Sequence, residues 1–262
     1  LICGDVGFGK TEVALRGAFN VAMSGAQVAF IVPTTLLCSQ HYENFTKRFK
    51  NFPLKVDQIS RLNSTSENNK IIERINSGES DVVVGTHALL NSKIKFKKLG
   101  MLIIDEEQHF GVSQKEKIKS LRSNVHVLAL TATPIPRTLQ MSLVGLRDLS
   151  IISTAPLNRQ NINTEVIDFN DEKIISAIEY ELSRNGQVYY VCPRINELKE
   201  VEDFLKSKLP NVKYQIAHGQ MPSKNLKNTM IDFYNSEFQL LLCTTIVESG
   251  LDLQKTNTMI IH

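Results

Sequence analysis

The stretch Gly4-Asp5-Val6-Gly7-Phe8-Gly9-Lys10-Thr11 is the most specific structural signal in the sequence. It fits the pattern G-x-x-x-x-G-K-[ST], in which glycines allow successive backbone N–H groups to turn toward one anion. The pattern predicts a strand before the loop and a helix after it, and the positive end of that helix faces the same anion. Leu1 and Ile2 fit the end of such a strand, and Glu12–Met23 has helical periodicity.

Five residues of this stretch are candidate binding groups. Gly4, Gly7 and Gly9 are expected to shape the phosphate cradle, Lys10 to reach the β and γ phosphates, and the Thr11 hydroxyl to ligate Mg²⁺. A plain glycine turn is the alternative, and the flanking strand and helix count against it. A phosphate loop alone also serves kinases, transporters and GTPases, so the surrounding motifs have to identify the class.

The run Ile103-Ile104-Asp105-Glu106-Glu107 is an apolar strand that ends in three acids. A carboxylate at the carboxyl end of a parallel strand lies where ligands bind in open α/β sheets. We expect Asp105 to hold Mg²⁺ and Glu106 to accept a proton from the attacking water, which with Lys10 makes three candidate catalytic residues. Alone, the acids could be a solvated surface loop, but the phosphate loop favours the catalytic interpretation.

Short apolar runs alternate with helical segments along the whole chain, which is the pattern of a parallel α/β sheet. In the first half, the predicted strands are Val28–Val32, Lys55–Ile59, Asp81–Val84, Met101–Ile104, Val125–Leu130 and Ser150–Ser153. The predicted helices are Glu12–Met23, Leu36–Phe49, Asn68–Asn76, Lys115–Leu121 and Pro136–Leu143.

A polar segment with a proline, residues 154–163, is the predicted linker between a first domain at 1–153 and a second at 164–262. The second series has predicted strands at Thr164–Phe169, Gln187–Val191, Tyr214–Ala217, Leu240–Cys243 and Thr258–Ile261. Its predicted helices are Glu172–Arg184, Leu198–Leu209 and Lys224–Tyr234. Gly186 stands where a left-handed helix cap is expected.

The composition is that of a globular protein, with 42% hydrophobic and 22% charged residues among 262. No apolar run approaches the roughly 20 residues that span a bilayer, which predicts no membrane partner and a cytoplasmic location. A net charge of +3 is too small to indicate a nucleic-acid partner by itself. Any prediction about DNA therefore depends on motifs.

Six motifs occur in the order of motifs I, Ia, Ib, II, III and V of the superfamily 2 helicases. They are the phosphate loop, PTTLL at 33–37, GTH at 85–87, DEEQ at 105–108, TAT at 131–133 and TTIVESGLD at 244–252. The strings DEEQHFGV, LTATPIPRTL and GLRDLSII resemble the bacterial transcription-repair coupling factor (Mfd) family, and the related RecG family shares part of them. The resemblance implies an α/β fold of two tandem RecA-like P-loop domains with parallel sheets, the second truncated.

The resemblance also implies roles for further residues. Small hydroxyls at strand ends suit phosphate oxygens and do not read bases, so DNA contacts are expected at Thr34, Thr35, Thr86, His87, Arg194, Thr244 and Thr245. Gly250 and Asp252 are expected to face the nucleotide from the second domain. Gln108, Thr131, Thr133 and Glu248 are expected to couple the nucleotide state to the second domain.

The activity implied is ATP hydrolysis with Mg²⁺, driving translocation on double-stranded DNA to displace stalled RNA polymerase in transcription-coupled repair. RNA polymerase and UvrA are implied as partners by the family alone. Two alternatives stay open: RecG-type fork remodelling, and a nucleotide-dependent DNA clamp without turnover. Motif VI with its arginine finger does not occur in the sequence, and such an arginine contributes ~10³ to 10⁵ in rate, so the chain alone is expected to hydrolyse ATP weakly.

Overall fold

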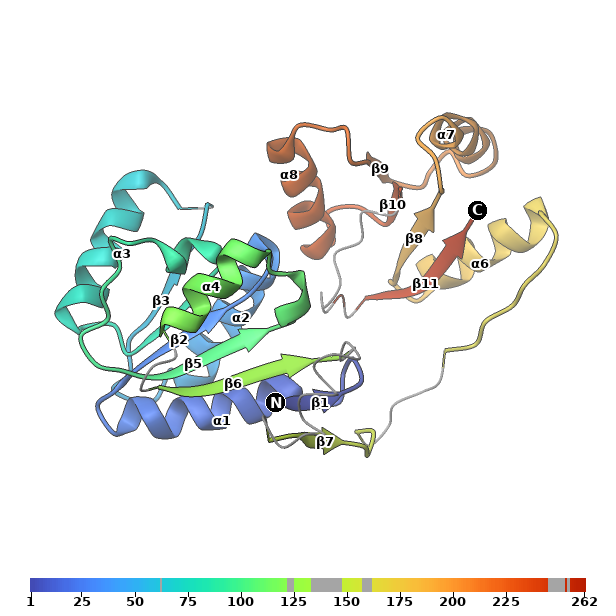
Figure 1. Cartoon of the computed structure of the whole chain (residues 1–262). Helices are drawn as coiled ribbons and strands as arrows, with labels where there is room; N and C mark the ends of the chain where they lie inside the picture. Colours follow the sequence, from blue (N-terminus) through green and yellow to red (C-terminus); the bar gives the residue numbers. More distant parts are fainter. Residues whose placement is uncertain (62, 122–124, 133–147, 157–161, 245–252, 254) are drawn as a thin grey trace. The chain divides into compact units, whose positions relative to one another are not determined.

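The computed structural model describes residues 1–61, 63–121, 125–132, 148–156, 162–244, 253 and 255–262 (Figure 1). They divide into two compact units, Leu1–Gln160 and Asn161–His262. Each unit has its own parallel sheet and its own hydrophobic core. The predicted α/β class with parallel sheets is therefore confirmed, whereas the predicted domain bounds and the linker at 154–163 stay predictions.

The described residues of the first unit form a seven-stranded sheet in the order β3-β4-β2-β5-β6-β1-β7, with every pair parallel. The strands are β1 (Ile2–Gly4), β2 (Gln27–Ile31), β3 (Val56–Ile59), β4 (Val82–Gly85), β5 (Leu99–Asp105), β6 (His126–Thr131) and β7 (Ser150–Ile152). Because all are parallel, their carboxyl ends lie along one edge, where ligands bind in such sheets.

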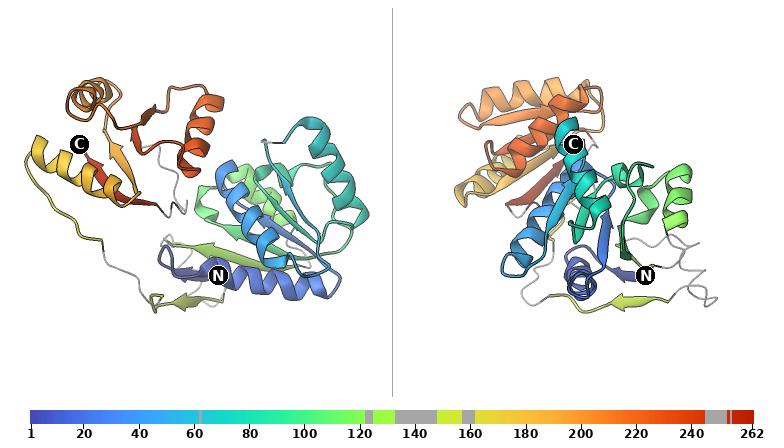
Figure 2. Two further views of the ribbon diagram at one scale, coloured as in Figure 1. Left: turned by 180° about the vertical axis from the view of Figure 1, so that it is seen from behind. Right: turned by 90° about the vertical axis from the view of Figure 1, so that its left-hand side faces the viewer.

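Helices cover both faces of this sheet, as the two views in Figure 2 show. The elements are α1 (Lys10–Met23), α2 (Thr35–Phe49), α3 (Thr65–Ser77), α4 (Val112–Leu121) and the short 3₁₀ helices η1 (His87–Leu90) and η2 (Glu107–His109). Strand β2 is buried throughout and divides its side chains between the faces. Ala29 and Ile31 pack with residues of α3 and α4, and the Phe30 ring packs against Phe45 of α2, with centroids 5.3 Å apart.

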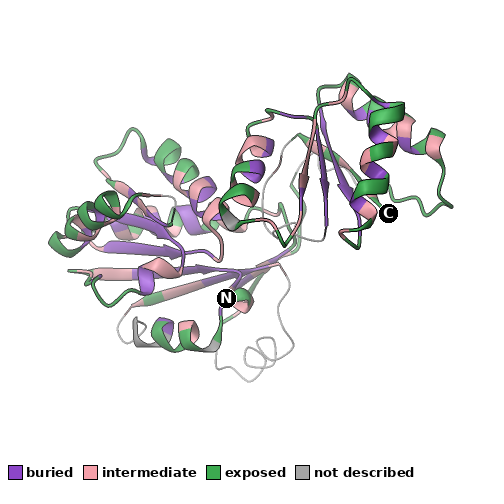
Figure 3. Cartoon of the chain, turned by 90° about the horizontal axis from the view of Figure 1, so that it is seen from above, coloured by how far each residue is buried: buried purple, intermediate pink, exposed green. Residues whose placement is uncertain are grey.

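The described residues of the second unit form a four-stranded sheet in the order β11-β8-β10-β9, again parallel. The strands are β8 (Gln187–Val191), β9 (Tyr214–Ala217), β10 (Leu240–Cys243) and β11 (Thr256–Ile261), and the helices are α6 (Asp171–Ser183), α7 (Glu197–Lys208) and α8 (Ser223–Tyr234). Tyr190 packs with α6 and α7, whereas Tyr189 packs on Phe233 of α8, with ring centroids 5.1 Å apart. The central strands are the buried layer of Figure 3.

Two sequence expectations about the second unit are wrong. Thr164–Phe169 is not a strand: its residues are exposed, Val166 at 97%, and the segment pairs with no strand among the described residues, because alternation alone does not supply a hydrogen-bonding neighbour. Gly186 does not take the left-handed conformation, which belongs to Asn185 (φ 59°). A Cβ on Gly186 would lie 1.6 Å from Oε1 of Glu181, so glycine is needed there for space.

The remaining predicted strands have counterparts in the structure, with ends shifted by a few residues. The predicted helix Pro136–Leu143 lies outside the described residues. Within the part of the chain that the structure describes, no helix combines the length and the apolar character needed to cross a membrane.

Candidate active site

The carboxyl ends of β5, β6 and β1 bring three sequence motifs together, because these strands are neighbours in the sheet. Asp105 at the end of β5 is in register with Leu130 of β6, and Thr131 is in register with Cys3 of β1. The phosphate loop follows β1 directly at Gly4. The acids, the first residues of the TAT motif (Thr131 and Ala132) and the loop, which are far apart in sequence, therefore lie side by side at one edge.

The phosphate loop has the backbone that its glycines predict. Gly7 (φ 77°) and Gly9 (φ 86°) are left-handed, and a Cβ at either would meet no atom within 4 Å, so conformation and not space requires glycine. Gly4 is tight instead, since its Cβ would lie 3.1 Å from that of Ile152 on β7. The loop can thus present its N–H groups toward an anion at the start of α1.

The ammonium group of Lys10 folds back over this loop. Its Nζ donates to the carbonyl oxygens of Gly4, at 2.7 Å, and Asp5, at 3.1 Å. Thr11, the second residue of α1, is half-buried beside it. A positive charge and a hydroxyl at the first turn of a helix are the groups that a triphosphate and its metal ion need.

Asp105 and Glu106 are nearly buried, at 9% and 8% exposure, in contrast to a solvated acidic loop. One carboxylate oxygen of Asp105, Oδ2, lies 3.3 Å from Nε2 of His41 on α2. Glu106 has left-handed backbone angles (φ 49°, ψ 56°), which turn the chain sharply into η2. A non-glycine residue in that conformation is strained, and such strain is typical of functional sites.

The carboxylate of Glu106 is held by the TAT motif and by Gln108. Its Oε1 accepts the backbone N–H of Ala132 at 3.2 Å, and its Oε2 accepts the Thr131 hydroxyl at 3.5 Å and the side-chain amide of Gln108. The Thr131 hydroxyl also lies 3.5 Å from Oε1 of Gln108. A buried acid fixed in this way is suited to accept a proton from water at the loop.

The donor set fits a magnesium ion that is shared with a nucleotide. Mg²⁺ in phosphate sites is held by one or two carboxylates together with phosphate oxygens, and it retains several waters. Asp105 and Thr11 would supply the protein's share. The described residues contain no cluster of three or more histidine, cysteine, aspartate or glutamate side chains that could hold a metal ion by themselves.

The predicted DNA contacts of the first unit follow the neighbouring strands β4 and β2. Thr34 and Thr35 are half-buried at the start of α2, and Thr34 Oγ1 accepts the N–H of Leu37 at 3.3 Å. Thr86 is 1% exposed, and its hydroxyl accepts the N–H of Ala88 at 3.4 Å. Both hydroxyls therefore act as helix caps in the structure, and Thr35 is the threonine of this group without a capping role.

His87 has a basic neighbour that the sequence interpretation missed. Nη2 of Arg61, two residues after the end of β3, lies 3.3 Å from Nε2 of His87. Burial lowers the pKa of His87, and the nearby guanidinium lowers it further. Arg61 is exposed, and its position after a predicted strand was a usable signal, since the same rule selected Thr34 and Thr86.

Two predicted residues of the second unit, Arg194 and Thr244, are among the described residues, and each follows a strand of its sheet. Arg194 follows β8, has a 77% exposed side chain and lies 4.0 Å from Glu197, whereas Thr244 follows β10 and is 8% exposed. The backbone N–H of Thr244 donates to the carbonyl of Ala217 at 3.2 Å. Five predicted residues lie outside the described residues: Thr133, Thr245, Glu248, Gly250 and Asp252.

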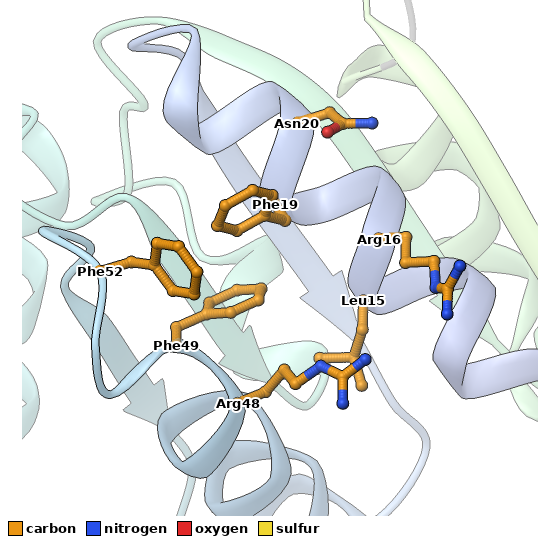
Figure 4. A pocket seen from close by; sticks show the side chains of 7 residues that line it. All are labelled: Leu15, Arg16, Phe19, Asn20, Arg48, Phe49 and Phe52. Carbon is orange, nitrogen blue, oxygen red and sulfur yellow. The ribbon is translucent and has the colours of Figure 1, made fainter.

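A pocket of about 320 Å³ opens between α1 and the end of α2 (Figure 4). Phe19 lies at its centre, with its ring 5.6 Å from that of Phe49 and 4.7 Å from that of Phe52. Arg16 and Arg48 stand at its rim, and both pair with Glu12. None of the residues that line it is a predicted site residue, so the candidate site is at the strand ends and not in this pocket.

Comparison with known families defines the class of protein. Residues 1–142 match the DEAD/DEAH box helicase family, and residues 171–262 match the helicase conserved C-terminal domain. The chain therefore belongs to the DEAD/DEAH box helicase family, and the predicted enzyme class, superfamily 2 helicase or translocase, is confirmed. This class binds nucleotide together with a metal ion.

Within this family, the chain is similar to transcription-repair-coupling factors. The chain is 52% identical, over its whole length, to the transcription-repair-coupling factor of Rickettsia bellii and 51% identical to that of Staphylococcus haemolyticus. It covers 24% and 22% of these proteins, so it spans about a quarter of the length of the relatives it matches.

Among solved structures, RecG bound to a three-way DNA junction is similar, with a TM-score of 0.77 and 32% identity over 98% of this chain and 35% of that one. The predicted tandem RecA-like fold and the predicted resemblance to transcription-repair coupling factors and RecG are confirmed.

Proposed function

We propose that the chain is the ATP-hydrolysing motor of a double-stranded DNA translocase used in transcription-coupled repair, where it displaces stalled RNA polymerase. One observation carries the proposal: the buried Glu106 carboxylate accepts the N–H of Ala132, which fixes a general base beside the phosphate loop. The relatives' printed name, transcription-repair-coupling factor, supports the biological setting. RNA polymerase, UvrA and a cytoplasmic location belong to the proposal on that basis.

ATP is the proposed nucleotide, and Mg²⁺ the proposed metal ion. Lys10 would exchange its hydrogen bonds to Gly4 and Asp5 for the phosphates, which need a donor with a full positive charge. Asp105 and Thr11 would hold the ion, which supplies charge neutralisation at the phosphates. Glu106 would orient the attacking water and accept its proton.

The TAT motif is the proposed route from the nucleotide to the rest of the motor. Any change at the Glu106 carboxylate is transmitted directly to the backbone of Ala132 and to the Thr131 hydroxyl, which hydrogen-bond it. Gln108 is held in the same network. Thr133 and Glu248, together with Gly250 and Asp252 facing the nucleotide, complete the proposed coupling between the two units.

The DNA track is proposed to follow the strand ends beside the nucleotide groups. In the first unit it would comprise Thr34, Thr35, Thr86, His87 and Arg61, and in the second Arg194, Thr244 and Thr245. Hydroxyls, backbone N–H groups and an arginine recognise phosphate and are indifferent to base sequence, as tracking along DNA requires. The RecG relative was solved on a three-way DNA junction, which supports DNA as the ligand.

Two other functions fit the same site, and RecG-type fork remodelling is the nearer of them because of the structural similarity to RecG. The intact protein should be tested on a transcription complex stalled on duplex DNA and, separately, on a model replication fork. ATP-dependent release of the polymerase without fork regression supports the proposal. Fork regression without release favours the RecG-type function, and DNA binding without turnover favours a clamp.

A further inference from the structure

His41 connects the proposed DNA-contacting residues at the start of α2 with the proposed metal ligand Asp105 at the end of β5. It is on α2, whose first turn carries Thr34 and Thr35, and its side chain reaches the end of β5. The residue is 5% exposed, and its ring packs against Phe30 with centroids 4.7 Å apart. A buried polar side chain needs a partner, and the contact with Asp105 is the one that the structure shows for Nε2.

The two ring nitrogens of His41 have different surroundings. Nε2 lies 3.3 Å from Oδ2 of Asp105, whereas Nδ1 is buried and has no hydrogen-bond partner among the described residues. Phenylalanine at this position would fill the same space without a buried, unpaired Nδ1, whose cost is about 1 to 3 kcal/mol. The arrangement therefore indicates that the Nε2 contact has a use.

We infer that His41 is a positioning residue for Asp105, holding one carboxylate oxygen so that the other faces the metal ion of the bound nucleotide. The Nε2–H group donates to Oδ2, which fixes the rotation of the carboxylate. Carboxylates that bind metal are commonly hydrogen-bonded in this way, and the loss of such a partner typically lowers metal affinity 10- to 100-fold. The inference rests on the proposed nucleotide-dependent function.

The position of His41 on α2 gives the contact a second consequence. Thr34 caps the helix through the N–H of Leu37, and His41 follows about two turns later on the same rigid element. A displacement of the α2 start by DNA would therefore move His41 against Asp105. Binding of DNA at Thr35 and binding of Mg²⁺ at Asp105 would then be coupled through one helix.

Three substitutions separate this role from packing. His41→Phe keeps a ring against Phe30 and removes the donor. His41→Gln keeps an amide nitrogen near the place of Nε2, and His41→Asn has the same amide one methylene shorter. If the phenylalanine variant does not fold, His41→Gln and His41→Asn still give the comparison, since both side chains are polar amides and differ in length alone.

The measurement is the affinity of the intact protein for a fluorescent ADP analogue, titrated with Mg²⁺ and repeated in EDTA. We expect His41→Phe and His41→Asn to raise the Mg²⁺ concentration for half-maximal tight binding ~10- to 100-fold, with affinity in EDTA unchanged and His41→Gln close to the unaltered protein. The inference is overturned if the Mg²⁺ dependence is unchanged in His41→Phe and His41→Asn, or if these variants lose nucleotide affinity equally with and without Mg²⁺. If the unaltered protein shows no Mg²⁺-dependent binding, the proposed function itself fails, which is a distinguishable result.

Discussion

The backbone N–H of Ala132 donates to Oε1 of Glu106 over 3.2 Å, so the residue that follows β6 holds the acid that follows β5. This contact connects two motifs that are 26 residues apart in the chain. It gives the proposed base a fixed orientation through a backbone hydrogen bond, which is the kind of preorganisation that catalysis uses.

Glu106→Gln tests that role. The amide keeps the size of the side chain and an acceptor for Ala132, but it cannot take a proton, so single-turnover ATP hydrolysis should slow by ~10² to 10⁴. Nucleotide affinity should stay within a few-fold. Glu107→Gln, at the half-buried acid next in the chain, is the control and should hydrolyse ATP normally. A hydrolysis rate for Glu106→Gln equal to that of the control would assign the base elsewhere.

The left-handed glycine at the end of the phosphate loop gives a second prediction. Gly9→Ala forces a side chain into φ 86°, which costs ~1 to 2 kcal/mol. Relief of this strain moves the loop away from its anion-binding shape, so nucleotide affinity should fall ~5- to 30-fold. Gly25→Ala is matched to it, with φ 77° and equally open surroundings, but lies in the turn after α1. Equal loss of nucleotide affinity in the two variants would show a general effect of destabilisation.

The DNA track predicts a salt-dependent, sequence-independent affinity. Arg61→Ala should weaken duplex binding on every sequence alike and reduce the slope of log affinity against log salt by ~1. Adding Thr35→Ala should weaken the free energy of duplex binding by roughly a further 0.5 to 1.5 kcal/mol. Lys55→Ala is the control, since Lys55 precedes β3 at the opposite end from Arg61 and pairs with Glu79 at 2.9 Å. Fluorescence anisotropy on duplexes of unrelated sequence measures these affinities. A loss of affinity in Lys55→Ala as large as that in Arg61→Ala would refute the proposed DNA track.

Glu181 predicts a pH dependence of stability in the second unit. Burial raises the pKa of this carboxyl, but hydrogen bonds from Arg184, Thr258 and Asn257 outweigh burial, so the pKa lies below its ordinary value. The ionised group therefore contributes stability above the unfolded pKa of about 4.3, and the contribution is lost as the pH falls through the lower folded value.

Urea unfolding should show Glu181→Gln less stable than the unaltered chain by ~1 to 3 kcal/mol at pH 7. The difference should shrink as the pH falls below the unfolded pKa of about 4.3, and it should be lost once the pH passes the lower pKa of the folded carboxyl. Glu165→Gln, at an exposed pair with Lys173, should change stability by less than about 1 kcal/mol. A difference for Glu181→Gln that persists unchanged to low pH would contradict the charged state assigned to Glu181.

Sequence patterns predicted the order of the elements because buried parallel strands are short apolar runs that end in polar residues. They indicated the candidate site for the same reason, since the phosphate loop and the acids each follow such a run, and the roles of its residues stay predictions. They failed at Thr164–Phe169, where the alternation occurs but no described strand pairs with the segment, because strand formation depends on the neighbours and not on the segment alone.

Tertiary contacts between distant residues were beyond sequence reasoning. Gln27 and Gln187 each begin a buried strand, and each donates its amide to two backbone carbonyls at the ends of nearby helices and turns. The polar side chains gave no sign of burial. His41 was missed for the same reason, because a histidine in a helix gives no indication of which strand end it faces.

The phosphate loop is proposed to power a motor that responds to duplex DNA. The most direct measurement is the steady-state rate of ATP hydrolysis by the intact protein as duplex DNA of unrelated sequences is added, for the unaltered protein and for Lys10→Ala. We expect a rate that rises with duplex DNA irrespective of sequence, and no hydrolysis above background in Lys10→Ala, because the Nζ group that would meet the phosphates is gone. A rate indifferent to duplex DNA, or one retained in Lys10→Ala, would contradict it.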